Sequence, residues 1–300
     1  MKLNKEWFIP APWGKIAALS YGNISGDPIL MVHGRQDSAA TFIPLLELMP
    51  NNYHYVAIDM PGNGRSDPFP ISVKLSRFHF VAAVEYVLLY LKWDKFIYIG
   101  HSMGCEQALF YNTVYPNHII KMIFLDLTPS LQRLQYLQEP DHYKRYSDYY
   151  NDYDFVNNNK KVYTKEQAVE VVMRARDLTQ KQAELILSRN LIEVDKDRYM
   201  LSWDRRLRYI VPQHYPNDYY YKLFTKKSPP ILHICANEGS KNYPSKLKEA
   251  KELLNWLEKG LKYFKVIYVD GGHDVHFTNP ERCAQHIVEF LNCEFEKSKL

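Results

Sequence analysis

The sequence predicts an α/β protein with a mostly parallel, doubly wound sheet and a mainly helical insertion. Short, continuous apolar runs alternate with amphipathic stretches, which is typical of parallel strands covered by helices on both faces. This alternation stops once and then resumes. We therefore expect one core formed by residues 1–128 and 228–297, with an insertion at residues 129–227. A short tail follows at residues 298–300.

The regular elements follow in order along the chain. Residues 6–22 are typical of a leading hairpin. Buried strands are expected at the apolar runs 27–34, 53–60, 95–102, 119–127, 229–237 and 263–273. Helices are expected at 40–49, 76–92, 103–115 and 245–259, and from Pro280 onward.

The insertion has a different pattern. Residues 164–178 and 179–191 are expected to be helices, because each begins with a threonine followed three residues later by a glutamine, a capping-box pattern. Residues 193–204 are typical of a hairpin. The tyrosine-rich residues 143–155 fit either a mobile lid or a packed loop.

Composition argues against several classes of protein. The net charge is only +4, and basic and acidic residues are interspersed, so no nucleic-acid partner is expected. No run of apolar residues is long enough for a transmembrane segment, and the first residues lack the apolar region of a signal peptide. The four cysteines show no metal-ligand spacing and are expected to be reduced thiols.

The stretch Gly100-His101-Ser102-Met103-Gly104 fits the pattern G-x-S-x-G, with a predicted strand before it and a predicted helix after it. A nucleophile elbow needs this context, and its glycines leave room where strand and helix approach closely. Serine is also a common turn residue, so the pattern alone does not decide. The context leads us to interpret Ser102 as a nucleophile.

A nucleophilic serine needs a base within hydrogen-bond reach. His273 follows the last predicted strand, where the base falls in the chain order serine, acid, histidine. His276 could form a metal pair with it, but the sequence offers no third ligand, so no metal is expected. His233 and Cys235 alternate on a predicted strand and are expected to be core residues.

Two backbone amides are expected to form an oxyanion hole. Met103 follows the nucleophile and would supply one, and Arg35, in the loop after the strand at 27–34, would supply the other. Residues 59–67 contain two close glycines, but Asp67 takes the place of a third one and no Walker lysine is present. We expect a tight turn there, with no nucleotide site and no cofactor.

Several of these stretches occur together in one family. "MVHGRQDSAATFIPLLELMP", "YVAIDMPGNGRSD", "IGHSMG", "IFLDLTP" and "GGHDVHF" resemble the α/β-hydrolase superfamily, and are most similar to its serine hydrolase-like members, which include the kraken type. The likeness covers most of the chain and is weaker in the tyrosine-rich part of the insertion. It implies the α/β-hydrolase fold, a cap domain at the insertion and hydrolysis of an ester-like bond.

The acid of the expected triad departs from the common pattern. Many α/β hydrolases take it from the turn after the strand at 229–237, but that position falls on Gly239 here, and Glu238 comes one residue early. The alternative position, after the strand at 119–127, holds Asp126. Asp126 could merely cap the next turn, but with glycine in the later position we favour Asp126 as the acid.

The leading hypothesis is a serine hydrolase of carboxylesterase type that cleaves an acyl ester, including a fatty acyl ester, through an acyl-enzyme on Ser102, Asp126 and His273. A pocket between sheet and cap, lined partly by cap tyrosines, would bind the substrate. An alternative is an acyl-CoA thioesterase with the same triad. Residues 203–208, "WDRRLR", could meet coenzyme A phosphates, although a solvated hairpin is the simpler expectation. A non-catalytic small-molecule binding protein is the alternative from another class.

The chain ends in Ser298, Lys299 and Leu300, the tripeptide that import receptors read as a peroxisomal address. A frayed tail after the last helix is the competing interpretation. We expect a peroxisomal protein that binds the import receptor, with the cytoplasm as the alternative location.

Overall fold

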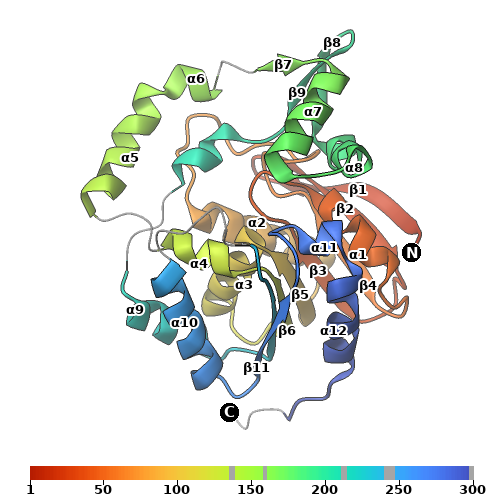
Figure 1. The fold of residues 1–300 in the computed structure, drawn as a ribbon, viewed down its shortest axis with the longest axis vertical. Helices are drawn as coiled ribbons and strands as arrows, with labels where there is room; N and C mark the ends of the chain where they lie inside the picture. Colours follow the sequence, from red (N-terminus) through yellow and green to blue (C-terminus); the bar gives the residue numbers. More distant parts are fainter. Residues whose placement is uncertain (135–138, 158–160, 211–214, 240–246, 297–300) are drawn as a thin grey trace.

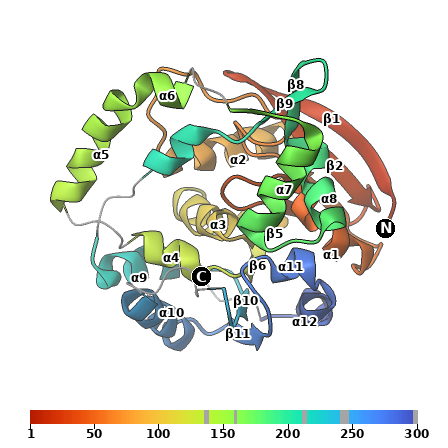
Figure 2. The same cartoon turned by 45° about the horizontal axis from the view of Figure 1, so that its top comes forward.

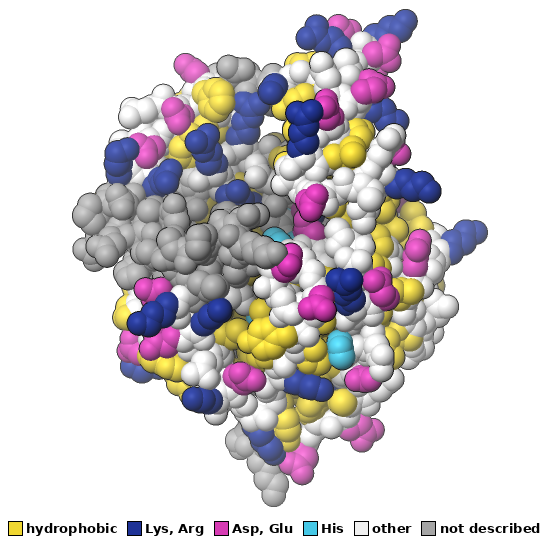
Figure 3. All heavy atoms as spheres, viewed as in Figure 1, with side chains coloured by type: hydrophobic (Ala, Val, Ile, Leu, Met, Phe, Trp, Pro, Cys, Tyr) yellow, Lys and Arg dark blue, Asp and Glu magenta, His cyan; other side chains and the backbone are white. Residues whose placement is uncertain are grey.

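The computed structural model describes residues 1–134, 139–157, 161–210, 215–239 and 247–296 (Figure 1). The predicted address at Ser298, Lys299 and Leu300 lies outside the described residues, so it stays a prediction. No helix in the described ranges combines the length and apolar character needed to cross a bilayer. On the face drawn in Figure 3, Lys and Arg alternate with Asp and Glu rather than gathering in one patch.

An eight-stranded sheet forms the centre, with strand order β1-β2-β4-β3-β5-β6-β10-β11. Its strands are β1 (Leu3–Ala11), β2 (Gly14–Gly22), β3 (Pro28–Val32), β4 (His54–Ile58), β5 (Phe96–His101), β6 (Ile119–Leu125), β10 (Ile231–Ala236) and β11 (Phe264–Val269). β1 and β2 form the predicted hairpin, and β2 pairs antiparallel with β4. All pairs from β4 to β11 are parallel, which confirms the predicted mostly parallel sheet.

Helices cover both faces of this sheet. They are α1 (Ile43–Glu47, preceded by the 3-10 helix η1, Ala39–Phe42), α2 (Arg77–Leu91), α3 (Met103–Val114), α10 (Leu247–Gly260), α11 (Val275–Thr278) and α12 (Glu281–Asn292). Alternate residues of β3 enter two separate apolar clusters: Leu30 packs in the cluster with α2, α3 and α10, and Met31 in the cluster with α1 and α12. This explains why the strands have continuous apolar runs rather than an alternating pattern.

The sheet has a switch point between β3 and β5. The chain moves outward from β3 to β4, and then returns to the other side of β3 with β5. In parallel sheets, ligands bind beyond the carboxyl ends of the strands at such a point. The loop after β3 and the turn after β5 meet there.

The insertion lies between β6 and β10 and is mostly helical. It contains α4 (Thr128–Leu134), α5 (Glu139–Asn151), α6 (Tyr153–Asn157), α7 (Lys165–Arg176), α8 (Gln180–Asn190), η2 (Arg205–Tyr209) and α9 (Asn217–Thr225), and a small sheet of β7 (Val162–Tyr163), β8 (Leu191–Asp195) and β9 (Arg198–Leu201). The predicted capping boxes at Thr164 and Thr179 are present. α5 and α6 stand out to one side, whereas α7 and α8 lie over the sheet (Figures 1 and 2).

The structure corrects the expectation for two segments of the insertion. The tyrosine-rich residues 143–155 form parts of α5 and α6, not a loop, because Tyr149 and Val156 bury one side of these helices against Tyr209. Residues 203–208 are not a solvated hairpin. Asp204 caps η2, and Arg206, 3% exposed, donates hydrogen bonds to backbone carbonyls of the segment after β4, including that of Phe69.

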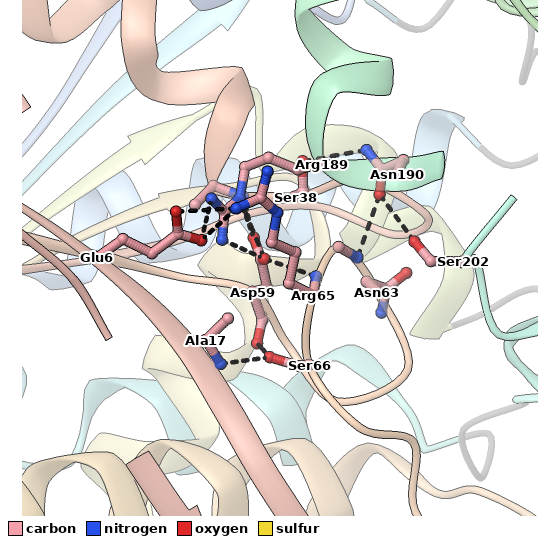
Figure 4. A network of polar contacts seen from close by, with 12 residues as sticks. Glu6, Ala17, Ser38, Asp59, Asn63, Arg65, Ser66, Arg189, Asn190 and Ser202 are labelled. Atoms are coloured by element: carbon pink, nitrogen blue, oxygen red, sulfur yellow. Dashed lines mark hydrogen bonds and ion pairs between the residues drawn. The ribbon is translucent and has the colours of Figure 1, made fainter. Parts of the chain in front are cut away.

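Helix α8 is attached to the core by a buried ion pair (Figure 4). The Arg189 Nη2 atom lies 2.7 Å from Asp59 Oδ2, at the end of β4, and Nη1 lies 2.9 Å from Glu6 Oε1. Arg189 is 5% exposed and Asp59 is fully buried. Next to them, the Asn190 side chain donates to Ser38 Oγ at 3.0 Å. This part of the insertion is therefore fixed to the core by an ion pair between two buried groups, Arg189 and Asp59, with the partly exposed Glu6 beside it.

Candidate active site

Ser102 lies on a sharp turn between β5 and α3. Its backbone angles, φ 50° and ψ −115°, are in a region that residues other than glycine rarely adopt. The flanking glycines are required: a Cβ at Gly100 would lie 2.6 Å from the Cys105 nitrogen, and one at Gly104 would lie 2.1 Å from the Val32 oxygen. Ser102 therefore lies on a strained strand-to-helix turn of the kind that a nucleophile elbow needs.

The loop after β3 packs directly against this turn. A Cβ at Gly34 would lie 3.1 Å from the Ser102 Cβ. The buried ring of His33 fixes the loop, because Nδ1 donates to the Gly34 carbonyl at 2.6 Å and Nε2 accepts from the Met60 amide at 2.9 Å. Arg35 follows at once, and it lines the cavity that Ser102 also lines.

The structure brings Asp126 and His273 together. The His273 Nδ1 atom donates to Asp126 Oδ2 at 2.6 Å. Asp126 is 1% exposed and has φ 52°, so the chain turns sharply after β6. The Asp126 amide donates to the Ile234 carbonyl at 2.8 Å, and its Oδ1 accepts from the Ala236 amide at 3.2 Å. The neighbouring strand β10 thus holds the carboxylate in place.

Gly239, at the later acid position, has no room for a side chain. A Cβ at Gly239 would lie 2.0 Å from Asp126 Oδ2. Glu238, one residue earlier, is exposed at the cavity. The Asp126 carboxylate therefore fills the space beside the His273 Nδ1 atom.

A cavity of about 700 Å³ joins these groups. Ser102, Met103, His273 and Arg35 all line it, so the predicted nucleophile, base and oxyanion-hole residues meet at one place. The described contacts contain no direct hydrogen bond between the Ser102 hydroxyl and the His273 ring, and such bonds often tighten only when substrate binds.

Cap residues close the cavity from above. They come from the end of α7 and from the segment around η2, at 174–177, Trp203, Leu207 and Ile210. The expectation of cap tyrosines is not met among the described lining residues. The lining has a strongly charged character instead, with four arginines and four acidic residues: Arg35, Arg77, Arg174, Arg176, Asp37, Asp177, Glu238 and Asp274.

Three histidine rings lie against one another beside the cavity, with the His101 ring tilted by 42° to that of His273 and by 40° to that of His276. The centroid of the His101 ring lies 4.7 Å from that of His273 and 4.1 Å from that of His276. Burial lowers the pKa of His276 to about 3 and, with the two neighbouring rings, holds the pKa of His101 well below 6.5. Burial also disfavours the His273 imidazolium, but the hydrogen bond and charge of Asp126 outweigh burial, so the pKa of His273 is raised above 6.5. Of the three rings, His273 therefore binds a proton most readily, and the other two rings are neutral.

The metal-ligand chemistry of the site is already committed to other partners. In the described ranges, Asp126, His233 and Cys235 form one cluster of ligand atoms within 4.8 Å of one another. The His233 Nε2 atom accepts from the Leu127 amide at 3.1 Å, and burial raises the pKa of the Cys235 thiol to about 11. These two residues are buried in the core, as predicted. His276 Nε2 is bonded to the Thr41 hydroxyl at 2.9 Å, and His273 Nδ1 is bonded to Asp126, so one ring nitrogen of each of these two histidines already has a protein partner.

A second cluster contains Asp37, His101 and Asp274. It already holds a cation of the chain itself, the Arg176 guanidinium, which contacts both carboxylates. The residues present therefore fit an internal ion pair rather than a metal centre.

Comparison with known proteins gives the same fold. The family model described as alpha/beta hydrolase fold matches residues 27–280. The chain belongs to the alpha/beta hydrolase fold family. A serine hydrolase-like protein of Danio rerio is 29% identical over 95% of this chain and 88% of its own length, and serine hydrolase-like protein 2 of Homo sapiens is 27% identical over 97% and 95%. A hypothetical protein of Pseudomonas aeruginosa PAO1 with a solved structure covers 95% of this chain and 97% of its own, with a TM-score of 0.79 and 24% identity.

Within this alpha/beta hydrolase, sequence reasoning missed the charged groups that surround the predicted site. Asp274 follows His273 directly, but the pattern His273-Asp274-Val275-His276 suggests only a base or a pair of metal-binding histidines and no role for Asp274. Asp37 comes two residues after Arg35, in a loop where the sequence pattern indicates only a backbone amide for the oxyanion hole. Arg176 lies in a helix among other charged residues, and no local signal distinguishes it.

Proposed function

We propose that this protein is a serine hydrolase that cleaves a carboxylic ester through an acyl-enzyme, with Ser102 as nucleophile, His273 as base and Asp126 as the acid. One observation carries the proposal: the 2.6 Å hydrogen bond from His273 to the buried Asp126, at the cavity where Ser102 lies on its strained turn. A serine with no catalytic role would need neither a strained turn nor a histidine bonded to a buried carboxylate nearby. The names of the curated serine hydrolase-like relatives favour the same chemistry.

The proposed reaction has two balanced halves. The Ser102 oxygen attacks the ester carbonyl while His273 Nε2 takes the hydroxyl proton, and the Met103 and Arg35 amides bind the oxyanion. The bond to the leaving alcohol then breaks, and His273 gives that alcohol its proton. Water repeats the cycle on the acyl-enzyme and releases the acid.

The lining favours a short or polar acyl group over a long alkyl chain, because charged side chains surround the cavity and an alkyl chain gains nothing from them. This weighs against a fatty acyl ester. The thioesterase alternative also loses support, because Arg206 of the "WDRRLR" segment is buried and hydrogen-bonded within the protein. A carboxylic ester of small or polar acids is therefore the substrate class we propose.

A panel of p-nitrophenyl esters from acetate to dodecanoate, with acyl-CoA thioesters beside it, tests the proposal. We expect turnover to be highest with short chains and to fall by about 10⁶ in Ser102→Ala, the scale seen when a serine protease loses its nucleophile. A fluorophosphonate probe should label the wild-type protein and leave Ser102→Ala unlabelled. Retention of more than about a tenth of the turnover in Ser102→Ala would contradict the assignment. A folded protein without turnover or labelling would instead be the binding protein of the alternative hypothesis.

A further inference from the structure

Arg176, the last residue of α7, connects the cap to two loops of the core. Its Nη2 atom lies 2.9 Å from Asp37 Oδ2 and 2.8 Å from Asp274 Oδ1, and its Nε donates to Asp274 Oδ2 at 2.9 Å. Asp37 is 2% exposed, and the other two side chains are 15% exposed. One guanidinium thus holds two carboxylates that are almost out of contact with water.

The two carboxylates belong to the two loops that the proposed reaction uses. Asp37 lies two residues after Arg35, in the loop that would supply an oxyanion amide, and its Oδ1 accepts from the Ser38 amide at 2.9 Å. Asp274 follows His273 and begins α11, where its carbonyl accepts from the Phe277 amide at 2.8 Å. A shift of either loop would therefore move a group that must meet the ester.

We propose that Arg176 is a positioning residue, through which the cap holds the oxyanion loop and the base loop in one fixed arrangement. This inference rests on the proposed function. A guanidinium suits the task because its planar, rigid fork fixes direction as well as distance, whereas a lysine ammonium fixes only a point charge. Effects on orientation far from the reacting bond can cost turnover as heavily as the loss of a contact.

The same guanidinium sets part of the electrostatic field at the base. The charged and titratable groups around the His273 ring are Asp126, Asp274, Arg176, His101 and His276. Asp126 and Asp274 raise the pKa of His273, and the Arg176 charge lowers it. Loss of the Arg176 charge therefore removes one influence that lowers the pKa of His273 and leaves the two carboxylates that raise it.

The test compares Arg176→Met and Arg176→Lys with Arg189→Met in the full chain, using p-nitrophenyl butyrate. Arg189 is a matched control, because it is also a buried cap arginine paired with a buried core carboxylate, Asp59, but it is not among the described residues that line the cavity of His273. Arg176→Met should lose roughly 10- to 100-fold in kcat with a smaller change in KM. The acid limb of its kcat/KM profile should move to higher pH, because a base with a higher pKa stays protonated to higher pH.

Arg176→Lys separates geometry from charge. It should lose kcat, because the fork is gone, and keep the acid limb of the wild type, because the charge remains. Arg189→Met should lower the melting temperature without moving the acid limb. If Arg176→Met and Arg189→Met lose equal activity and neither moves the limb, Arg176 is only a structural contact and the proposal is overturned.

Failure of this inference and failure of the proposed function give different results. Titration of the histidine rings by NMR reads the pKa of His273 in wild type and in the Arg176 variants without any turnover. If no ester is hydrolysed but the His273 pKa rises in Arg176→Met, the proposed function fails and the electrostatic part of this inference stands. If Arg176→Met does not fold, Asp274→Asn gives the opposite sign: the pKa of His273 should fall, and an unchanged pKa overturns the inference.

Discussion

The turn after β6 and the turn after β10 end neighbouring parallel strands, and both point to the same side of His273. The first carries Asp126, whose carboxylate is buried and bonded to the His273 Nδ1 atom. The second carries Gly239 at the matching point, with its Cβ position 2.0 Å from Asp126 Oδ2. Only one of the two turns can place a side chain in that space.

This comparison shows that a triad acid is specified by a position in space rather than by a position in the chain. The base needs one carboxylate at the nitrogen that faces away from the serine, and either turn reaches that nitrogen. The glycine in one turn is therefore as informative as the aspartate in the other. Three tests of this view are Asp126→Asn, an exchange of the two turns with its single-site controls, and Glu238→Gln.

Asp126→Asn should have the largest effect of the three. We expect kcat/KM to fall by about 10⁴, as for the serine-protease aspartate, because the ring loses the carboxylate that orients it. The pKa of His273 should fall, because Asp126 raises it, so the acid limb of the profile should move to lower pH. A pH series of ester turnover measures both. Full activity in Asp126→Asn would place the acid elsewhere.

Exchange of the two turns should restore part of that loss. In the double variant Asp126→Gly with Gly239→Asp, the carboxylate comes from β10, and glycine accepts the φ of 52° at position 126. We expect about tenfold more activity than in Asp126→Gly alone, because about 1.4 kcal/mol of regained interaction with His273 corresponds to a factor of ten.

Gly239→Asp alone is the matched control for the exchange. Its side chain meets the Asp126 carboxylate, so it should lose about 1–3 kcal/mol of stability in urea unfolding. If the double variant folds but is no more active than Asp126→Gly, the two turns are not interchangeable.

Glu238→Gln should have the smallest effect. Glu238 is exposed, and substitutions on an exposed surface change free energies by about 0.5 kcal/mol, or roughly twofold in rate. The same turnover assay measures it. A loss comparable to that of Asp126→Asn would reverse the comparison and make Glu238 the acid.

The core fold could be predicted because its strands are buried on both faces. Runs such as 29–32 and 96–99 are continuously apolar, and that property is visible in any window of the sequence. Helix α5 was not predicted because its buried side is made of tyrosine in a mostly polar stretch, which gives no apolar period. The two-residue strand β7 exists only through its pairing with β9, which is far away in the sequence.

The residues of the candidate site also differ in whether the sequence alone indicates them. Ser102, His273 and Asp126 were predicted because each follows a strand whose end is visible in the sequence, and the sheet brings such ends together. Arg176 could not be predicted, because its partner Asp274 lies 98 residues away and the cap must fold back over the sheet before the two meet. Long-range ion pairs of this kind have no local pattern.

The buried pair of Asp59 and Arg189 also limits how this protein can diverge. Loss of either residue alone leaves a buried charge without its partner, which costs about 3–5 kcal/mol, a large share of the roughly 5–15 kcal/mol that stabilises a typical domain. A lineage can therefore replace the pair only by changing both residues nearly together. Single substitutions at exposed positions of α5 and α6 carry no such penalty, so the sequence can change more freely on that side of the cap than at α8.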